Sequence, residues 1–254
     1  MQPLTVVGGG GGPQTGVYST FQDTSQVVSA VNTYGWVGIG AVAGNGAMTT
    51  SPWTTPYVYN GLTVDQIVEA AYSQGANFWW LDFWTVAGPS SNLDSDWLDA
   101  GEAAGEKAAY TIMQAAINGG GFLPAYVILD PEGDNTTNIT ESQFTNLAQG
   151  WVKGVNTQSS GKLTAAIYQD QYNWTTWNLN SLLDLGGNPI PGFVAVSPVA
   201  TPSATGSHIV GYCAAYGSCP AAGDSVAGDV STVNSWGALM NTLQLSNDSY
   251  DCYS

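Results

Sequence analysis

Short apolar segments alternate along this chain with helix-capping signals, and no other feature of the sequence restricts the possible folds as much. The segments 36–43, 78–86 and 125–130 are apolar almost throughout, as strands buried on both faces are. The strongest helical pattern follows the third of these segments, where Thr140 and Gln143 form a capping box. Strands and helices in this order predict an α/β fold built on a parallel sheet.

The alternation is long enough for one closed barrel. We expect seven strands, beginning at Val17, Trp36, Phe78, Ala125, Leu163, Gly192 and His208, and an irregular eighth whose position stays open. Seven or eight strand–helix units in about 250 residues have the size of a single (β/α)8 barrel of the TIM type. Residues 17–254 are therefore predicted as the barrel domain, and residues 1–16 as a Gly-rich N-terminal arm. A doubly wound sheet is the alternative, but the run Gly8–Gly12 precedes the first strand, where it cannot form a phosphate loop.

Charged residues are scarce in this chain. Its 254 residues include only 3 Lys and Arg against 19 Asp and Glu, and the net charge is −16. Proteins that bind nucleic acid or anionic membranes need a basic surface, which three scattered lysines cannot supply. The single histidine, His208, excludes a multi-histidine metal centre. We therefore expect no metal, no other cofactor, no nucleic-acid partner and no membrane partner.

The same charge count predicts tolerance of acid. At about pH 3 most carboxylates would be protonated and few positive charges would remain, so self-repulsion would stay small. This composition fits a protein secreted into an acidic medium, although compositional drift in a surface protein would also produce it. The chain has no leader sequence, so it is either cytosolic or has lost a signal peptide, and we favour the second interpretation. Cys213, Cys219 and Cys252 suit an oxidising compartment, and their disulfide pairing stays open.

Acidic residues mark the ends of three predicted strands. Asp82 closes the third strand, Asp130 and Glu132 close the fourth, and Asp170 follows the fifth. In a parallel barrel these ends meet at one face, where active sites form. An extended chain directs Asp130 and Glu132 to one side, with their Cα atoms roughly 6.6 Å apart. A carboxylic acid beside a carboxylate can protonate a glycosidic oxygen and stabilise the developing cation. A simple Asp-Pro turn and a hard-cation site are the alternatives.

Aromatic and polar side chains accompany these acids. Rings that could stack on sugars lie at or just after the strand ends, at Trp80, Trp84, Tyr168 and Trp174. Gln169 and Asp170 add groups that can form hydrogen bonds with sugar hydroxyls. His208 is the only base available for a serine-hydrolase triad, but the sequence has no G-x-S-x-G elbow. An esterase or amidase is therefore the least favoured interpretation.

The order of these motifs resembles glycoside hydrolase family 25, the muramidase-type lysozymes, and related glycoside-hydrolase-like barrels of secreted bacterial proteins. The similar segments are 16–19 as the first strand, 78–82 as the third, 104–132 as a helix leading into a D-x-E strand, and 166–174 as the next strand with a following Trp.

The resemblance also implies roles for individual residues. It makes Glu132 the proton donor, while Asp130 stabilises the cationic transition state or orients a substrate N-acetyl group. Asp82 is the third acid of the expected catalytic set. The family usually has an acid on its first strand, where this chain has Tyr18 and Ser19. We count Tyr18 among the expected substrate-binding residues.

Together these features predict a secreted, single-domain glycosidase that cleaves a cell-wall or related N-acetylated polysaccharide by carboxylic acid and carboxylate catalysis. The alternative is a catalytically silent barrel that binds glycan or builds an extracellular surface layer. Tyr18 and Ser19, together with the many Ser, Thr and Asn residues, favour that alternative.

Overall fold

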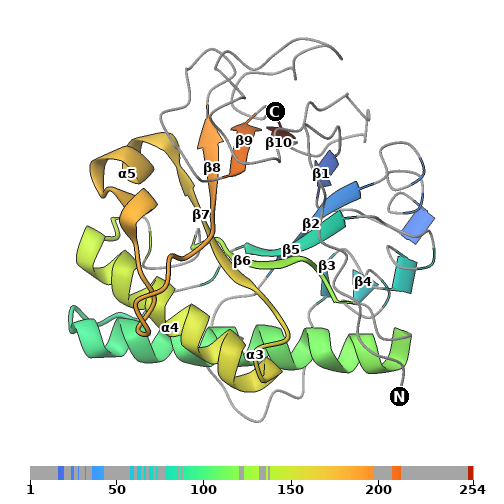
Figure 1. The fold of residues 1–254 in the computed structure, drawn as a ribbon, viewed down its shortest axis with the longest axis horizontal. Coiled ribbons are helices and arrows are strands. Elements are labelled where there is room, and N and C mark those ends of the chain that lie inside the picture. Colours follow the sequence, from blue (N-terminus) through green and yellow to red (C-terminus); the bar gives the residue numbers. More distant parts are fainter. Residues whose placement is uncertain are drawn as a thin grey trace.

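The computed structural model of the chain contains a barrel of strands with helices packed against it (Figure 1). The described residues are 17–19, 36–42, 58–59, 62–63, 78–84, 88–119, 123–131, 138–196, 208–212 and 251–253, with the single positions 24, 25, 28, 32, 66, 69, 70, 73, 86 and 136.

Eight of the described strands form a closed barrel, in the order β1–β2–β5–β6–β7–β8–β9–β10, with β10 paired to β1. Their bounds are β1 Val17–Ser19, β2 Trp36–Val42, β5 Phe78–Trp84, β6 Tyr126–Leu129, β7 Ala165–Asp170, β8 Gly192–Val196, β9 His208–Tyr212 and β10 Asp251–Tyr253. From β1 to β9 neighbouring strands pair in parallel, whereas β10 is antiparallel to both of its neighbours. A short antiparallel hairpin, β3 (Val58–Tyr59) with β4 (Leu62–Thr63), forms a separate sheet.

The structure has strands at all seven predicted places, with ends that differ by a few residues. The helices α3 (Asp94–Gly119), α4 (Glu141–Ser159) and α5 (Gln171–Thr176) follow β5, β6 and β7, so this part of the chain has the strand–helix order of the expected barrel. The eighth strand departs from a regular (β/α)8 pattern because it is antiparallel. Such a strand starts at the barrel end where β9 stops, so it needs no crossover to the opposite end.

The long helices α3 and α4 pack side by side against one side of the strands (Figure 1). The expected capping box opens α4: the Thr140 hydroxyl accepts a hydrogen bond from the Gln143 N–H, and the Gln143 side chain accepts one from the Thr140 N–H. Glycines let the two helix backbones touch. A Cβ at Gly101 would overlap the Leu147 carbonyl oxygen, and a Cβ at Gly150 would overlap the Leu98 carbonyl oxygen. Gly105 and Gly154 make equivalent contacts one turn further along.

One ring contact shows which face of the strands points toward the helices. Phe83 on β5 packs against Trp151 on α4, with ring centroids 5.9 Å apart. The Trp151 indole N–H also donates to the Val127 carbonyl oxygen on β6, at 3.3 Å. Phe83 is therefore one of the alternate residues of β5 that face the helices. The residues before and after it lie on the other face, inside the barrel.

Several sequence-based expectations concern residues outside the described ones. They are the N-terminal arm 1–16, Cys213 and Cys219, and the side chain of Cys252. Among the described helices, none is long and apolar enough to cross a membrane.

Candidate active site

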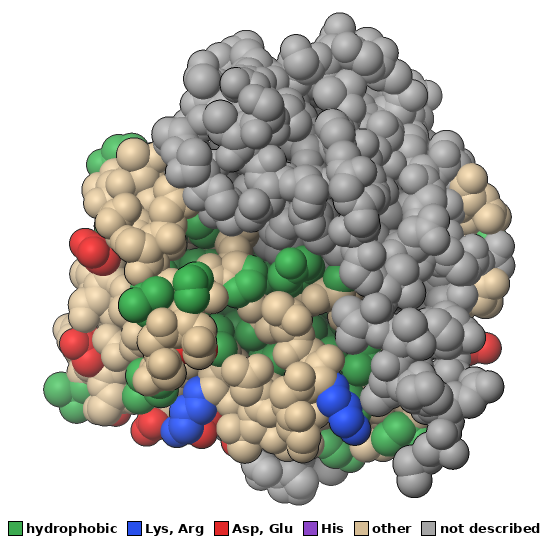
Figure 2. Space-filling view, viewed as in Figure 1, with side chains coloured by type: hydrophobic (Ala, Val, Ile, Leu, Met, Phe, Trp, Pro, Cys, Tyr) green, Lys and Arg blue, Asp and Glu red, His purple; other side chains and the backbone are tan. Residues whose placement is uncertain are grey.

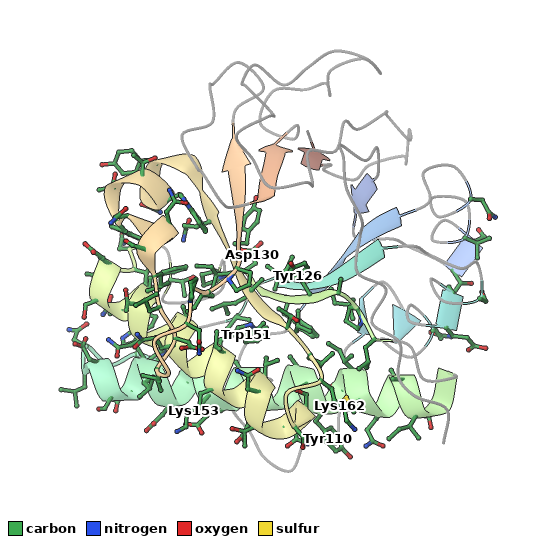
Figure 3. All side chains as sticks on the ribbon, viewed as in Figure 1. Tyr110, Tyr126, Asp130, Trp151, Lys153 and Lys162 are labelled. Atoms are coloured by element: carbon green, nitrogen blue, oxygen red, sulfur yellow. The ribbon has the colours of Figure 1, made fainter. Side chains whose placement is uncertain are left out.

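Asp130 lies where the chain leaves β6 at the carboxyl end of the strand. Its backbone N–H donates to the Phe83 carbonyl oxygen at 3.3 Å, and its own carbonyl accepts from the Val86 N–H at 3.3 Å. Two backbone hydrogen bonds thus hold Asp130 beside the end of β5, one residue beyond the last strand pair, Phe83 with Leu129. Asp130 is only 4% exposed. Figure 3 shows it within the barrel region, while Trp151, Lys153 and Lys162 lie on the side of α3 and α4.

The strand registers bring three expected site residues to neighbouring positions on the inside face. Asp82 on β5 is paired with Ile128, two residues before Asp130 on β6. Adjacent strands and a two-residue offset put the Cα atoms of Asp82 and Asp130 about 8 Å apart. Leu129 is paired with Ile167, so the next residues, Asp130 and Tyr168, are neighbours on β6 and β7. Tyr168 is buried, with 9% of its surface exposed.

The shift between neighbouring strands determines which inside positions lie at the same height in the barrel. From β1 through β2 and β5 to β6, the paired residues lead from Tyr18 to Tyr126. In the other direction, through β10, they lead from Tyr18 to Tyr212 on β9. The registers from β6 to β9 align Tyr126 with position 204, eight residues before Tyr212. A barrel of eight strands with a shear of eight arranges its inside positions in layers of four, taken from alternate strands.

Two such layers carry acids at the carboxyl ends of the strands. The lower layer consists of Tyr18, Asp82, Tyr168 and Val210, and the next layer toward the carboxyl ends consists of Gly40, Asp130, Ala195 and Asp251. In the second layer the acids come from β6 and β10, which are on opposite sides of the ring, and the other two positions are small. Trp84 and Asp170 follow on the same face, one layer further out.

Asp251 is a candidate site residue that the sequence analysis missed. It belongs to β10, a three-residue strand. Its register partners are Tyr18 on β1 and Tyr212 on β9. A strand this short has no periodic pattern of its own, so the only sequence signal is an acid between two tyrosines near the C-terminus.

The structure separates two of the expected binding residues from this face. Gln169 belongs to the opposite alternation from Tyr168 and Asp170, and its side-chain oxygen accepts a hydrogen bond from the Asn173 amide at 3.3 Å. Trp174 is 1% exposed, and its ring occupies the space above Gly192, where a Cβ would overlap it. The Trp174 indole N–H donates to Asn180 at 2.9 Å. Trp174 thus anchors α5 and has no ring face open to a sugar.

Two expected site residues remain, Trp80 and Glu132. Trp80 is on the inside face, paired with Tyr126 at the start of β6. Burial raises the pKa of Tyr126, because its phenolate would lose hydration. Glu132, the expected proton donor, lies outside the described residues.

None of the three lysines lies on a strand of the barrel. Lys107 is on α3 and Lys153 on α4, and Lys162 follows α4. Lys153 pairs with Glu102 on α3 at 2.6 Å, which joins the two helices at the surface. Burial lowers the pKa of Lys107. No described group of three or more His, Cys, Asp or Glu side chains is arranged to hold a metal ion.

Comparison with solved structures finds distant similarity over most of the chain. The bacterial lysozyme of Streptomyces coelicolor is 13% identical, covers 96% of this chain and 92% of its own, and has a TM-score of 0.43. The muramidase of Acremonium alcalophilum is 15% identical, with 94% and 92% coverage and a TM-score of 0.43. The family GH25 lysozyme of Aspergillus fumigatus is 16% identical, with 95% and 94% coverage and a TM-score of 0.42.

Neither the family models nor the curated proteins compared with this sequence match it. The last of these structures is named a family GH25 lysozyme, the family that the sequence motifs resemble, and its similarity to this chain is distant.

Proposed function

We propose that this protein is a glycoside hydrolase that cleaves a cell-wall or related N-acetylated polysaccharide at the carboxyl ends of its barrel strands. The observation that carries the proposal is the register of Asp82 and Asp130, which are neighbours on the inside face of β5 and β6. Acids at these positions, with no lysine on the same strands, suit a substrate whose transition state develops positive charge.

The chemistry needs one acid to give a proton and one to remain charged. Glu132, two residues after Asp130, is the proposed donor: its proton passes to the glycosidic oxygen as the bond from that oxygen to the anomeric carbon breaks. Asp130 stabilises the positive charge that develops on the sugar ring, or orients a substrate N-acetyl group. A water molecule then supplies the hydroxyl of the new reducing end, and its proton returns to the acid pair.

The neighbouring positions suit substrate binding. Tyr168 borders Asp130 on β7, and Trp84 borders it on β5, so each would offer an aromatic ring to a sugar beside the reacting bond. Tyr18 and Asp82 share a layer with Tyr168, and Asp170 lies further out on β7. Asp251 adds a further acid position from the opposite side of the ring. We leave Trp174 out of the proposed binding set because its ring is buried, and Gln169 because it lies on the opposite face of β7.

The proposal includes a secreted protein that works in an acidic medium, and its support is the low content of Lys and Arg. The partner is the polysaccharide itself, with no cofactor required by the carboxylate chemistry.

Release of reducing ends from purified peptidoglycan and from chitin tests the proposal. The wild-type chain should release them, and Glu132→Gln should release them about 10²- to 10⁴-fold more slowly, because an amide cannot supply the proton. Binding of either polysaccharide without any release would favour the catalytically silent glycan-binding barrel. Equal rates for the wild type and Glu132→Gln would remove Glu132 from the mechanism.

A further inference from the structure

The surface formed by α5 and the 3-10 helix η1 (Leu179–Ser181) combines an exposed ring with uncharged polar groups. Tyr172, on α5, is 75% exposed, more than any other large apolar side chain among the described residues. It follows Asp170, the outermost acid position on β7, by two residues. An exposed ring offers an apolar face whose burial under a ligand would be favourable.

Contacts with two other elements hold α5 in place. The buried Trp174 ring fits over Gly192 at the start of β8 and donates its N–H to Asn180. Trp177, just after α5, packs against Phe144 on α4 with ring centroids 5.5 Å apart. The Trp177 backbone N–H donates to the Asn173 carbonyl oxygen at 2.9 Å. Because α5 is fixed before any ligand arrives, Tyr172 would lose little conformational entropy on binding.

The segment of the chain around Tyr172 contains no charged side chain. Residues 171–183 include no Asp, Glu, Lys or Arg, and the exposed side chains beside Tyr172 are hydroxyls and amides, among them Thr175, Thr176 and Asn178. In Figure 2 the area of α5, at the upper left, has green and tan atoms but no blue ones, and the blue lysines lie over the helices at the lower edge. This surface does not suit a charged partner.

A sugar ring has the matching chemistry, since it offers an apolar face of C–H groups and an edge of hydroxyls. From the exposure, anchoring and neutrality of this surface we propose that Tyr172 is a stacking platform for a sugar ring of the bound polysaccharide, in a subsite outside the barrel mouth. The occupant rests on the proposed function, because α5 begins directly after β7, and Tyr168 on β7 neighbours Asp130. The amides and hydroxyls around Tyr172 would form hydrogen bonds with the hydroxyls of the same ring.

Binding of N-acetylglucosamine oligomers, measured by calorimetry without reference to turnover, tests the platform. The hexamer spans several subsites and the dimer only those near the mouth. Tyr172→Ala should weaken hexamer binding about five- to tenfold, the loss expected when one ring contact disappears, and leave dimer binding unchanged. Tyr172→Trp should keep hexamer binding. Tyr110→Ala is the matched control, because Tyr110 is 37% exposed on α3, on the opposite side from Asp130 (Figure 3).

The outcomes separate the platform from the proposed hydrolase. Tyr172-dependent binding of the hexamer without release of reducing ends would refute the hydrolase and support the platform. Cleavage of peptidoglycan with unchanged hexamer binding in Tyr172→Ala would support the hydrolase and overturn the platform. A wild-type chain that does not bind the hexamer, or a Tyr172→Ala chain that loses dimer and hexamer binding equally, would also overturn it.

Discussion

The α3–α4 pair and the inside ends of β5, β6 and β7 lie on opposite faces of the same strands, and they are built from opposite kinds of residue. Between the helices, Gly101 and Gly150 remove side chains so that the backbones can touch. On the inside face, Asp82 and Asp130 occupy neighbouring positions two residues apart in register on adjacent strands. The first arrangement stabilises the fold, whereas two acids at neighbouring inside positions would be retained for the proposed chemistry, since folding alone does not require them.

The comparison predicts that a substitution on the inside face lowers activity without lowering stability, whereas a substitution between the helices lowers stability. Asp130→Asn should lower turnover about 10²- to 10⁴-fold, since an amide cannot balance a developing cation, while the melting temperature stays the same or rises. Initial rates on peptidoglycan and thermal melting of the same samples would check both effects. Unchanged turnover in Asp130→Asn would contradict the place of Asp130 in the site.

The opposite behaviour is expected in the helix pair. Gly150→Ala forces the added methyl against the Leu98 carbonyl oxygen, so one helix must move, at a cost of about 3 kcal/mol in the free energy of unfolding. Chemical denaturation measures this cost, and Gln158→Ala, at an exposed position of α4, is the control. Gly101→Ala should give a similar loss, because its added methyl would overlap the Leu147 carbonyl oxygen on α4. Retained stability in both variants would mean that the helices are not in contact at these glycines.

The local signals of the sequence predicted the elements better than the contacts between them. The capping box of Thr140 and Gln143 and the apolar strands are encoded by neighbouring residues, and the structure contains them. The burial of Trp174 depends on Gly192, 18 residues further along, and no local pattern contains that pair. Strand alternation separates Gln169 from Tyr168 and Asp170, although all three are predicted to bind the sugar.

The helix contact and the closing strand were missed for the same reason. Gly101 and Gly105 are four residues apart, as are Gly150 and Gly154, and this spacing marks one face of each helix. The spacing is visible in the sequence, but the partner helix is not. Likewise, β10 consists of three residues, and only its pairing with β1 and β9 reveals that Asp251 joins the layer of Asp130.

A smaller effect is expected from the newly found acid. Asp251→Asn should lower turnover about tenfold if this carboxylate adds to the electrostatic stabilisation from the opposite side of the mouth. Asp99→Asn, which removes the same charge from an exposed position on α3, should leave the rate unchanged. Equal effects of the two substitutions would attribute the loss to net charge instead of the position of Asp251.

The smallest effect concerns pH and the loop around Asp184, which follows Leu183, a hydrogen-bond partner of Gln149 on α4. Hydrogen bonds from Asn188, and then from Gly186 and Gly187, lower the pKa of Asp184. The Asp184 carboxylate accepts from the Asn188 and Gly186 backbone N–H groups, each at 2.8 Å. A carboxyl whose pKa is lowered in the folded chain stabilises it above the unfolded pKa, and this stabilisation is lost as the pH falls through the folded value.

We therefore expect a local loss of order around Asp184 below about pH 4, while the rest of the chain stays folded because it carries few positive charges. The pair of Lys153 and Glu102 is exposed and adds little to acid sensitivity. Amide exchange at Gly186 and Asn188 should accelerate at low pH, and Asp184→Asn should remove this dependence. Circular dichroism from pH 2 to 8 should show no global transition above about pH 3. Cooperative unfolding at higher pH would refute the acid tolerance inferred from the charge count, whatever the fate of the glycosidase proposal.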